Sequence, residues 1–182
     1  GMKVPEDKPL SRQQIAEQTE RKIRTQNISQ DLEEAAKFYR EQLPKHPDAV
    51  GYLKRRGLTG EIAQRFGLGF APDRPNLSSV FADYHQSSSL IDAGLVKQKE
   101  DNARRYDFFR DRVMFPIRNV KGQIIGFGGR IMDKGEPKYL NSPETPVFQK
   151  NQELYGLFEA RSSISHNRFA LVVEGYMDVV AL

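Results

Sequence analysis

The chain has 182 residues, of which 38% are hydrophobic and 29% charged, and its net charge is +4. This length suits one ordinary domain or two small ones. No apolar run approaches the roughly 20 residues of a membrane-spanning helix, and the start does not resemble a signal peptide. Without cysteine, disulfides and thiolate zinc sites are excluded, and we take a cytoplasmic setting as the default.

The N-terminal segment is expected to be an arm followed by a helix. Residues 1–11 contain two prolines and mixed charge, which predicts a linker or extended arm. In residues 28–43, apolar side chains recur at spacings of three and four, which predicts a helix. Ser29 is placed to cap its N-terminus, and Pro44 is placed to end it.

Short helices are predicted to follow as far as about residue 95. Four segments have the pattern: 47–58, 59–68, 76–85 and 87–95. Gly57 suits the C-terminal cap of the first, while Thr59 and Gly67 suit the two ends of the second. Residues 54–56, Lys-Arg-Arg, could bind nucleic acid, but a solvated helix C-terminus, which favours cations, explains them more simply.

The pattern changes to strands in the middle of the chain. The runs 113–118 and 124–131 are rich in β-branched and aromatic residues, and a turn with Gly122 separates them, which predicts a hairpin. Pro116 inside the first run predicts an edge strand or a bulge. Residues 138–143 add a brief extended piece.

The positive charge is concentrated in this middle segment. Residues 97–150 contain 12 Lys and Arg against 7 Asp and Glu, a balance of +5, so the other residues sum to −1. Such a balance suits a surface that faces a polyanion, such as nucleic acid or a nucleotide. An ordinary solvated face with a mild imbalance would have the same composition.

The C-terminal segment predicts a helix, a strand and a second helix. Residues 153–164 have a helical pattern, residues 169–174 ("FALVVE") resemble a buried parallel strand, and residues 176–182 begin another helix. The expected fold class is therefore α+β, with a helical first half, a small mixed or antiparallel sheet in the middle, and the first strand-turn-helix of an α/β unit.

Two carboxylates follow the predicted last strand. In open α/β sheets, ligand chemistry lies beyond the carboxyl ends of strands, where Glu174 would fall. Gly175 permits a tight turn, and Asp178 follows four residues after Glu174. The pair could bind a divalent metal, or Glu174 could act as a general base. Alternatively, Glu174 only ends the strand and Asp178 interacts with the helix dipole.

Two stretches of the chain carry a family resemblance. They read "RVMFPIRNVKGQIIGFGGRIMDKGEPKYLNSPETPVFQKNQELYGLFEA" and, shortly after it, "VVEGYMDVVAL". Together they resemble the catalytic core of bacterial DNA primases of the DnaG type. Several uncommon sequence words occur in the order of that family. The resemblance covers essentially the whole chain. It is strongest from Phe109 onward, clear in "YLKRRGLTGEIAQRFGLGFAP" and loose before residue 45.

The resemblance implies a set of site residues. "EGYMDV" opens the Toprim fold of that family, so Glu174 corresponds to the first acidic residue of the active site, as catalytic residue and metal ligand. Asp178 is a further candidate ligand, and the remaining aspartates would lie beyond Leu182. The residues implied to line the groove for template, primer and nucleotide are Arg112, Arg118, Arg130, Lys138, Tyr139, Asn141 and Lys150.

Two aromatic residues and a glycine cluster have more than one interpretation. Tyr139 and Phe127 are candidates for base stacking, although a core position is the better interpretation of Phe127. "GFGGR" does not match a phosphate-binding loop. A bend in a strand that lets nucleic acid or another backbone approach suits it better.

The resemblance also implies domains, activity and partners. Residues 1–11 would be the linker, 12–165 the basic nucleic-acid-binding domain, and 166–182 the start of a Toprim domain. The parent protein would make short RNA primers on single-stranded DNA from ribonucleoside triphosphates, using Mg²⁺ or Mn²⁺. A zinc-binding module would precede this chain, and regions beyond it would contact the replicative helicase and the single-strand-binding protein. We expect a cytoplasmic location at the replisome, no membrane partner, and no primer synthesis by this chain alone.

Other classes of protein remain as alternatives. The main one is a non-catalytic module that binds single-stranded nucleic acid and whose acidic end is structural. Another Toprim enzyme, such as a topoisomerase or nuclease, is a second. A type IA topoisomerase needs a nucleophilic tyrosine from a separate domain, and the words before Glu174 do not fit one. A generic scaffold is the third alternative.

Overall fold

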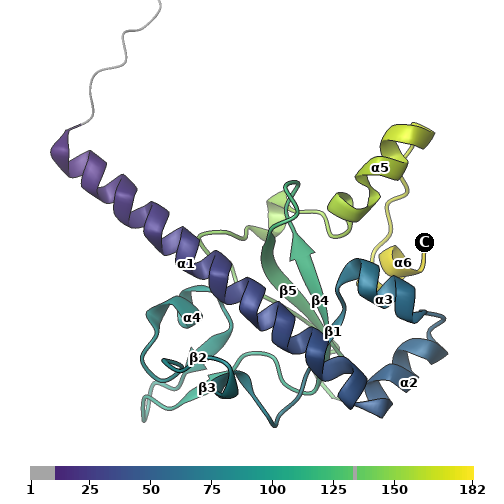
Figure 1. The fold of residues 1–182 in the computed structure, drawn as a ribbon, viewed down its shortest axis with the longest axis horizontal. Coiled ribbons are helices and arrows are strands. Elements are labelled where there is room, and N and C mark those ends of the chain that lie inside the picture. Colours follow the sequence, from purple (N-terminus) through teal and green to yellow (C-terminus); the bar gives the residue numbers. More distant parts are fainter. Residues whose placement is uncertain (1–10, 133–134) are drawn as a thin grey trace, which may run out of the picture.

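The computed structural model describes residues 11–132 and 135–182. Of the linker predicted for residues 1–11, all but Ser11 lies outside the described residues. The fold is α+β, as expected from the sequence. A long helix crosses one face of a four-stranded antiparallel sheet, and shorter helices cover the other face (Figure 1).

The long helix α1 spans Arg12–Gln42 and starts much earlier than predicted. Ser11 caps it in a reciprocal arrangement with Gln14: the Ser11 hydroxyl accepts the Gln14 N–H at 3.2 Å, and Gln14 Oε1 accepts the Ser11 N–H at 2.9 Å. The prediction that Ser29 caps the helix is wrong. Ser29 lies inside α1, and its hydroxyl donates to the Thr25 carbonyl at 3.0 Å. The first half of α1 is exposed on all sides, so no hydrophobic periodicity revealed it.

The helices after α1 largely follow the prediction. A 3₁₀ turn with Pro44, η1 (Leu43–Lys45), ends α1, and then come α2 (Pro47–Arg55), α3 (Gly60–Phe66), η2 (Leu77–Ser79) and α4 (Ser88–Asp92). Thr59 accepts the Ile62 N–H at 3.2 Å, and Gly67 ends α3 with φ +66°, so both predicted caps of α3 are confirmed. The segment 76–85 is less helical than expected, because it contains only η2 and turns.

The main sheet has the strand order β1-β4-β5-β6, with every neighbour antiparallel. Its strands are β1 (Gly69–Ala71), β4 (Arg112–Arg118), β5 (Ile124–Ile131) and β6 (Tyr139–Asn141), and a separate pair is formed by β2 (Val96–Gln98) and β3 (Arg105–Asp107). The predicted hairpin is therefore confirmed. Pro116 lies beyond the short β1, so its only partner among the described strands is β5, and the register shifts between Ile117 and Arg118.

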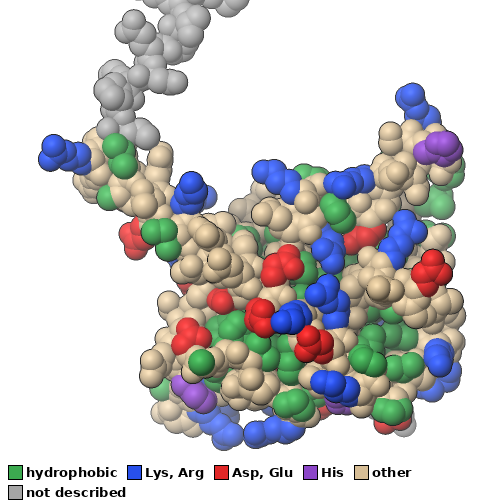
Figure 2. Space-filling view, viewed as in Figure 1, with side chains coloured by type: hydrophobic (Ala, Val, Ile, Leu, Met, Phe, Trp, Pro, Cys, Tyr) green, Lys and Arg blue, Asp and Glu red, His purple; other side chains and the backbone are tan. Residues whose placement is uncertain are grey.

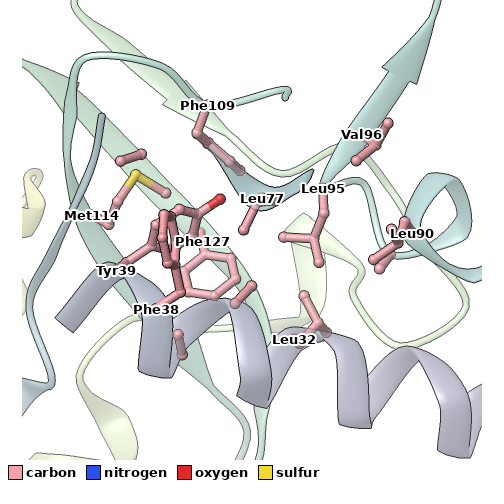
Figure 3. Close-up of a cluster of buried hydrophobic side chains, with 14 of the residues drawn as sticks. Leu32, Phe38, Tyr39, Leu77, Leu90, Leu95, Val96, Phe109, Met114 and Phe127 are labelled. Carbon is pink, nitrogen blue, oxygen red and sulfur yellow. The ribbon is translucent and has the colours of Figure 1, made fainter. Parts of the chain in front are cut away.

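The two faces of the main sheet form two cores. On one face, Met114 and Phe127 pack against α1, where the Tyr39 ring meets the Phe127 ring edge-on at 5.4 Å (Figure 3). Phe127 is thus a core residue, the interpretation favoured from the sequence. On the other face, Val113 and Phe115 pack against α2, α3 and the last helix.

The last part of the chain corrects one prediction. Helices α5 (Leu157–Asn167) and α6 (Tyr176–Ala181) form where expected. Residues 169–174, however, form no strand, and the Leu171 and Val172 side chains are 67% and 85% exposed. A strand needs a neighbour for its backbone hydrogen bonds, and none of the described strands runs beside this segment. Among the described residues, no helix has the length and apolar character to cross a membrane.

Candidate nucleic-acid and phosphate site

Three of the sequence motifs lie close together at one corner of the main sheet. In the β5–β6 pair, Arg130 lies opposite Tyr139, and Gly128 lies opposite Asn141. The Tyr176 hydroxyl, at the start of α6, donates to Asn141 Oδ1 at 2.8 Å. The Tyr139 hydroxyl lies 4.0 Å from the position that a Cβ would take on Gly175. "GFGGR", "PKYLN" and "EGYMD" are therefore neighbours in space.

Arg130 is a buried cation at this corner, with a side chain only 5% exposed. Its guanidinium lies 4.7 Å from the centre of the Tyr139 ring and 5.8 Å from that of Tyr52. Its Nε donates to the Tyr52 hydroxyl, and its Nη1 donates to the Tyr139 hydroxyl. No described carboxylate forms an ion pair with it. A buried cation without a counter-ion favours an incoming anion such as phosphate.

Gly128, which has no side chain, allows α6 to pack against β5 beside Arg130. A Cβ on Gly128 would lie 2.5 Å from the Tyr176 ring, so only glycine leaves room for that ring. Tyr176 stacks on Phe115 at 5.4 Å and meets the Tyr155 ring edge-on at 4.6 Å. This burial raises the pKa of Tyr176 to about 12. The close approach expected at "GFGGR" is thus made by a side chain of the same chain.

The two predicted carboxylates lie at the start of α6. Glu174 and Asp178 are both exposed. Asp178 Oδ2 lies 2.8 Å from the position of a Cβ on Gly175, so this carboxylate lies over the first turn, where the helix dipole favours negative charge. Glu174 forms no ion pair with a described Lys or Arg. Carboxylate oxygens suit Mg²⁺ or Mn²⁺, but the described residues contain no group of three acidic or histidine side chains that could hold a metal.

The remaining predicted basic residues are distributed over several places. Arg112 lies opposite Ile131 in the β4–β5 pair, so its side chain is on the other face of the sheet from Arg130. Its Nη1 donates to the Lys138 carbonyl at 3.5 Å, and burial lowers the pKa of Arg112. Arg118, at the far end of β4, is paired with Glu159 at 3.2 Å.

Two predicted lysines are free to meet a ligand. The Lys138 and Lys150 side chains are both exposed. Lys138 precedes Tyr139 directly, and since side chains alternate along an extended segment, its side chain leaves the opposite face from that of Tyr139. Lys150 starts η3 (Lys150–Gln152), where its backbone N–H donates to Glu144 Oε1 at 3.1 Å. The corner therefore gathers Arg130, Tyr139 and Asn141, but neither Arg112 nor Arg118.

A second surface combines basic and aromatic side chains on and next to β3. The Lys97 ammonium lies 4.5 Å from the centre of the Phe108 ring, and the Arg110 guanidinium lies 5.5 Å from that of Tyr106. We call these four residues the β3 basic surface. Such pairs suit single-stranded nucleic acid, because bases stack on aromatic rings while cations neutralise phosphates. The sequence signalled this surface only through the charge of residues 97–150.

The basic residues are dispersed over the visible face of the molecule. Figure 2 shows Lys and Arg side chains alternating with Asp and Glu, so this face of the described chain carries no continuous basic track. Tyr52, Tyr155 and Tyr176 were not among the residues predicted from the sequence. For Tyr176 a signal was available, since the glycines of "GFGGR" indicate that something approaches β5 closely.

Comparisons with known proteins show which families and folds this chain resembles. The family model described as "DNA primase catalytic core, N-terminal domain" matches residues 38–161. A DNA primase of Pseudomonas aeruginosa is 56% identical over 156 residues, covering 83% of this chain and 24% of that protein. The chain spans about a quarter to a third of the length of the curated relatives it matches.

Solved structures show the same fold. The structure of the DnaG primase catalytic domain bound to single-stranded DNA matches with a TM-score of 0.77 and 44% identity, over 86% of this chain and 52% of that one. The zinc-binding and RNA polymerase domains of the Aquifex aeolicus primase match with a TM-score of 0.80 and 34% identity, over 87% of this chain and 39% of that one.

Proposed function

Because the chain belongs to the family of N-terminal domains of the DNA primase catalytic core, we propose that it holds single-stranded template beside the centre where a DnaG-type primase makes RNA primers. One observation carries this proposal. The buried cation of Arg130, which pairs with no described carboxylate, lies at the same corner as the start of α6, where Glu174 and Asp178 lie. A phosphate-binding cation beside carboxylates is what nucleotidyl transfer requires.

Each residue of the corner has a proposed task. Arg130 binds a phosphate group of template, primer or nucleotide, and the exposed Lys138, next to Tyr139 in the chain, adds a second positive charge near the corner. Tyr139 and Asn141 hold Arg130 and Tyr176 in place. Glu174, with Asp178, would hold Mg²⁺ or Mn²⁺, which neutralises charge on the reacting phosphates when bound. Two carboxylates are too few for such a site, so we propose that this chain alone binds DNA without making primers.

The β3 basic surface is the proposed place for template bases. Lys97 and Arg110 would neutralise phosphates, while Tyr106 and Phe108 offer rings to the bases. One structural relative is described as bound to single-stranded DNA, which supports binding of single-stranded DNA by this chain. Residues 12–165 would form the nucleic-acid-binding part, and since α5 continues to Asn167, we place the start of the Toprim part after that helix.

The partners and the setting are proposed from the family. The substrates are single-stranded DNA, ribonucleoside triphosphates and the growing RNA primer, in the cytoplasm. The helicase and the single-strand-binding protein would contact other parts of the primase. Zinc would belong to a separate domain like the one in the Aquifex aeolicus relative.

Binding of a fluorescent oligo(dT) strand at a series of salt concentrations tests the proposal. We expect the dissociation constant to rise with salt, with a slope of about 0.7 on logarithmic axes for each phosphate contact. Replacement of Arg110 by Gln should lower this slope, while replacement of the distant, exposed Arg12 by Gln should not. Affinity that is independent of salt would refute the proposal.

A non-catalytic module that binds single strands is the second candidate, because Glu174 pairs with no described cation. Glu174→Gln in the full-length protein separates the two. Loss of primer synthesis with retained DNA binding supports the catalytic role, and unchanged synthesis supports the module.

A further inference from the structure

Tyr52 connects the helical half of the chain to the proposed phosphate site. It lies on α2, 78 residues before Arg130, and its side chain is buried in the core formed with Leu53 and Val113. Its hydroxyl accepts the hydrogen bond from Arg130 Nε, and its ring lies 5.8 Å from the Arg130 guanidinium. No sequence word of the β5–β6 region predicted this contact.

The contacts of Arg130 leave one edge of its guanidinium available. A guanidinium has five N–H hydrogens in a planar fork. One hydrogen, on Nε, is given to Tyr52, and one on Nη1 is given to Tyr139. Nη2 donates to no described group, and no described carboxylate pairs with the cation. The two tyrosines therefore fix the plane of the fork while its terminal edge stays free for a ligand oxygen.

Tyr52 also lies next to a second arginine. The guanidinium of the exposed Arg56 is 5.6 Å from the centre of the same ring. The face of an aromatic ring carries partial negative charge and attracts cations. Tyr52 can therefore hold a buried and an exposed arginine close to one ring, which raises the positive potential at this corner.

We propose that Tyr52 is a positioning residue for the phosphate site: its hydroxyl, together with that of Tyr139, holds the Arg130 guanidinium in place, with its free edge presented to a phosphate group of the nucleic acid or nucleotide. This inference rests on the proposed function, because it takes Arg130 as the phosphate ligand. It adds that the binding strength of Arg130 depends on a hydroxyl from α2. An arginine side chain has several rotatable bonds, so other residues must fix the orientation of the Arg130 guanidinium. The strength of its hydrogen bonds to a phosphate group depends on that orientation.

The test compares Tyr52→Phe with a matched control, Tyr39→Phe. Both changes remove one buried hydroxyl, but the Tyr39 hydroxyl has no partner among the described residues and lies on the opposite face of the sheet. Two probes are used on each protein, an oligo(dT) strand and inorganic tripolyphosphate. Tyr52→Phe should weaken the binding of both by about tenfold, because a hydrogen bond to a charged group is lost. Tyr39→Phe should leave both affinities unchanged.

A double-mutant cycle distinguishes positioning from a general loss of structure. If Tyr52 acts through Arg130, then Tyr52→Phe should have no further effect on tripolyphosphate affinity in a protein that already carries Arg130→Gln. Losses that simply add would overturn the proposal, as would a Tyr52→Phe protein with the affinities of the wild type. If Arg130→Gln does not fold, Arg130→Lys serves in the same cycle.

The two probes also separate this inference from the proposed function. Tripolyphosphate binding that depends on Tyr52, without any binding of oligo(dT), would keep the role of Tyr52 and refute template binding. Oligo(dT) binding that is equal in the wild type and Tyr52→Phe would refute the role of Tyr52 alone. A wild-type chain that binds neither probe would refute both.

Discussion

Gly128→Ala should dislodge α6 from the sheet. The new methyl group would lie 2.5 Å from Tyr176 Cζ and 2.6 Å from its Cε2. Carbon atoms in contact are normally about 3.5–4.0 Å apart, so the ring must move by about 1 Å or more. It cannot move alone, because it stacks on Phe115 and meets Tyr155 edge-on. Overpacking of this kind costs about 1–3 kcal/mol.

Thermal unfolding followed by circular dichroism measures this cost. For a chain of this size, each kcal/mol lowers the melting temperature by about 2–4 °C. The matched control is Gly60→Ala, at the start of α3, because a Cβ there would meet no atom within 4 Å. That variant should be as stable as the wild type or more stable by up to about 1 kcal/mol, since alanine favours helix.

A second measurement identifies Tyr176 as the cause. In a protein that carries Tyr176→Ala, the clash partner is gone, so Gly128→Ala should cost much less than in the wild type. A Gly128→Ala protein that melts at the wild-type temperature would contradict the predicted clash. An equal loss in the two backgrounds would contradict it as well.

Three further outcomes are expected. Burial raises the pKa of Asp107, which accepts a hydrogen bond from the Tyr84 hydroxyl at 2.6 Å. The folded state therefore binds the proton more readily than the unfolded state. The contribution of Asp107 to the free energy of unfolding should fall as pH rises from 3.8 through the folded pKa. Urea unfolding across this range should show that fall in the wild type but not in Asp107→Asn. Glu159→Gln should lower the free energy of unfolding by about 1–3 kcal/mol, because it leaves the partly buried Arg118 without its ion pair, and a variant with wild-type urea stability would contradict this. Phe108→Ala should weaken oligo(dT) binding by about tenfold through loss of a stacking ring, with no change in the titration counting against the β3 basic surface.

Local features of the fold could be predicted from the sequence. Thr59 and Gly67 mark the ends of α3 because a cap depends on a few adjacent residues. The β4–β5 hairpin follows from two apolar runs around a turn with Gly122. The first half of α1 escaped prediction because its side chains are exposed, so no burial imposes an apolar pattern on it and polar helix-forming residues suffice there.

The arrangement of the site depended on pairing that the sequence does not state. Arg112 and Arg130 both belong to the basic motifs that carry the resemblance to the family. The register of β4 and β5 nevertheless places their side chains on opposite faces of the main sheet. The contact between Tyr52 and Arg130 joins residues far apart in the chain. Residues 169–174 have the composition of a strand, but a strand also requires a partner, which composition cannot supply.

The position of α1 fixes a length scale for any bound strand. One core, which includes Tyr39 and Leu32 of α1, joins Leu95 and Val96 beside the β3 basic surface to Phe127 of the main sheet. In Figure 1 the β2–β3 pair lies on the left below α1, while α2 and α6 lie on the right, where α1 ends. The helix thus fixes the distance between these two places. A single strand of DNA that touches both places must cover a constant number of nucleotides. The affinity for an oligonucleotide should therefore rise in a step once it is long enough to reach from one place to the other.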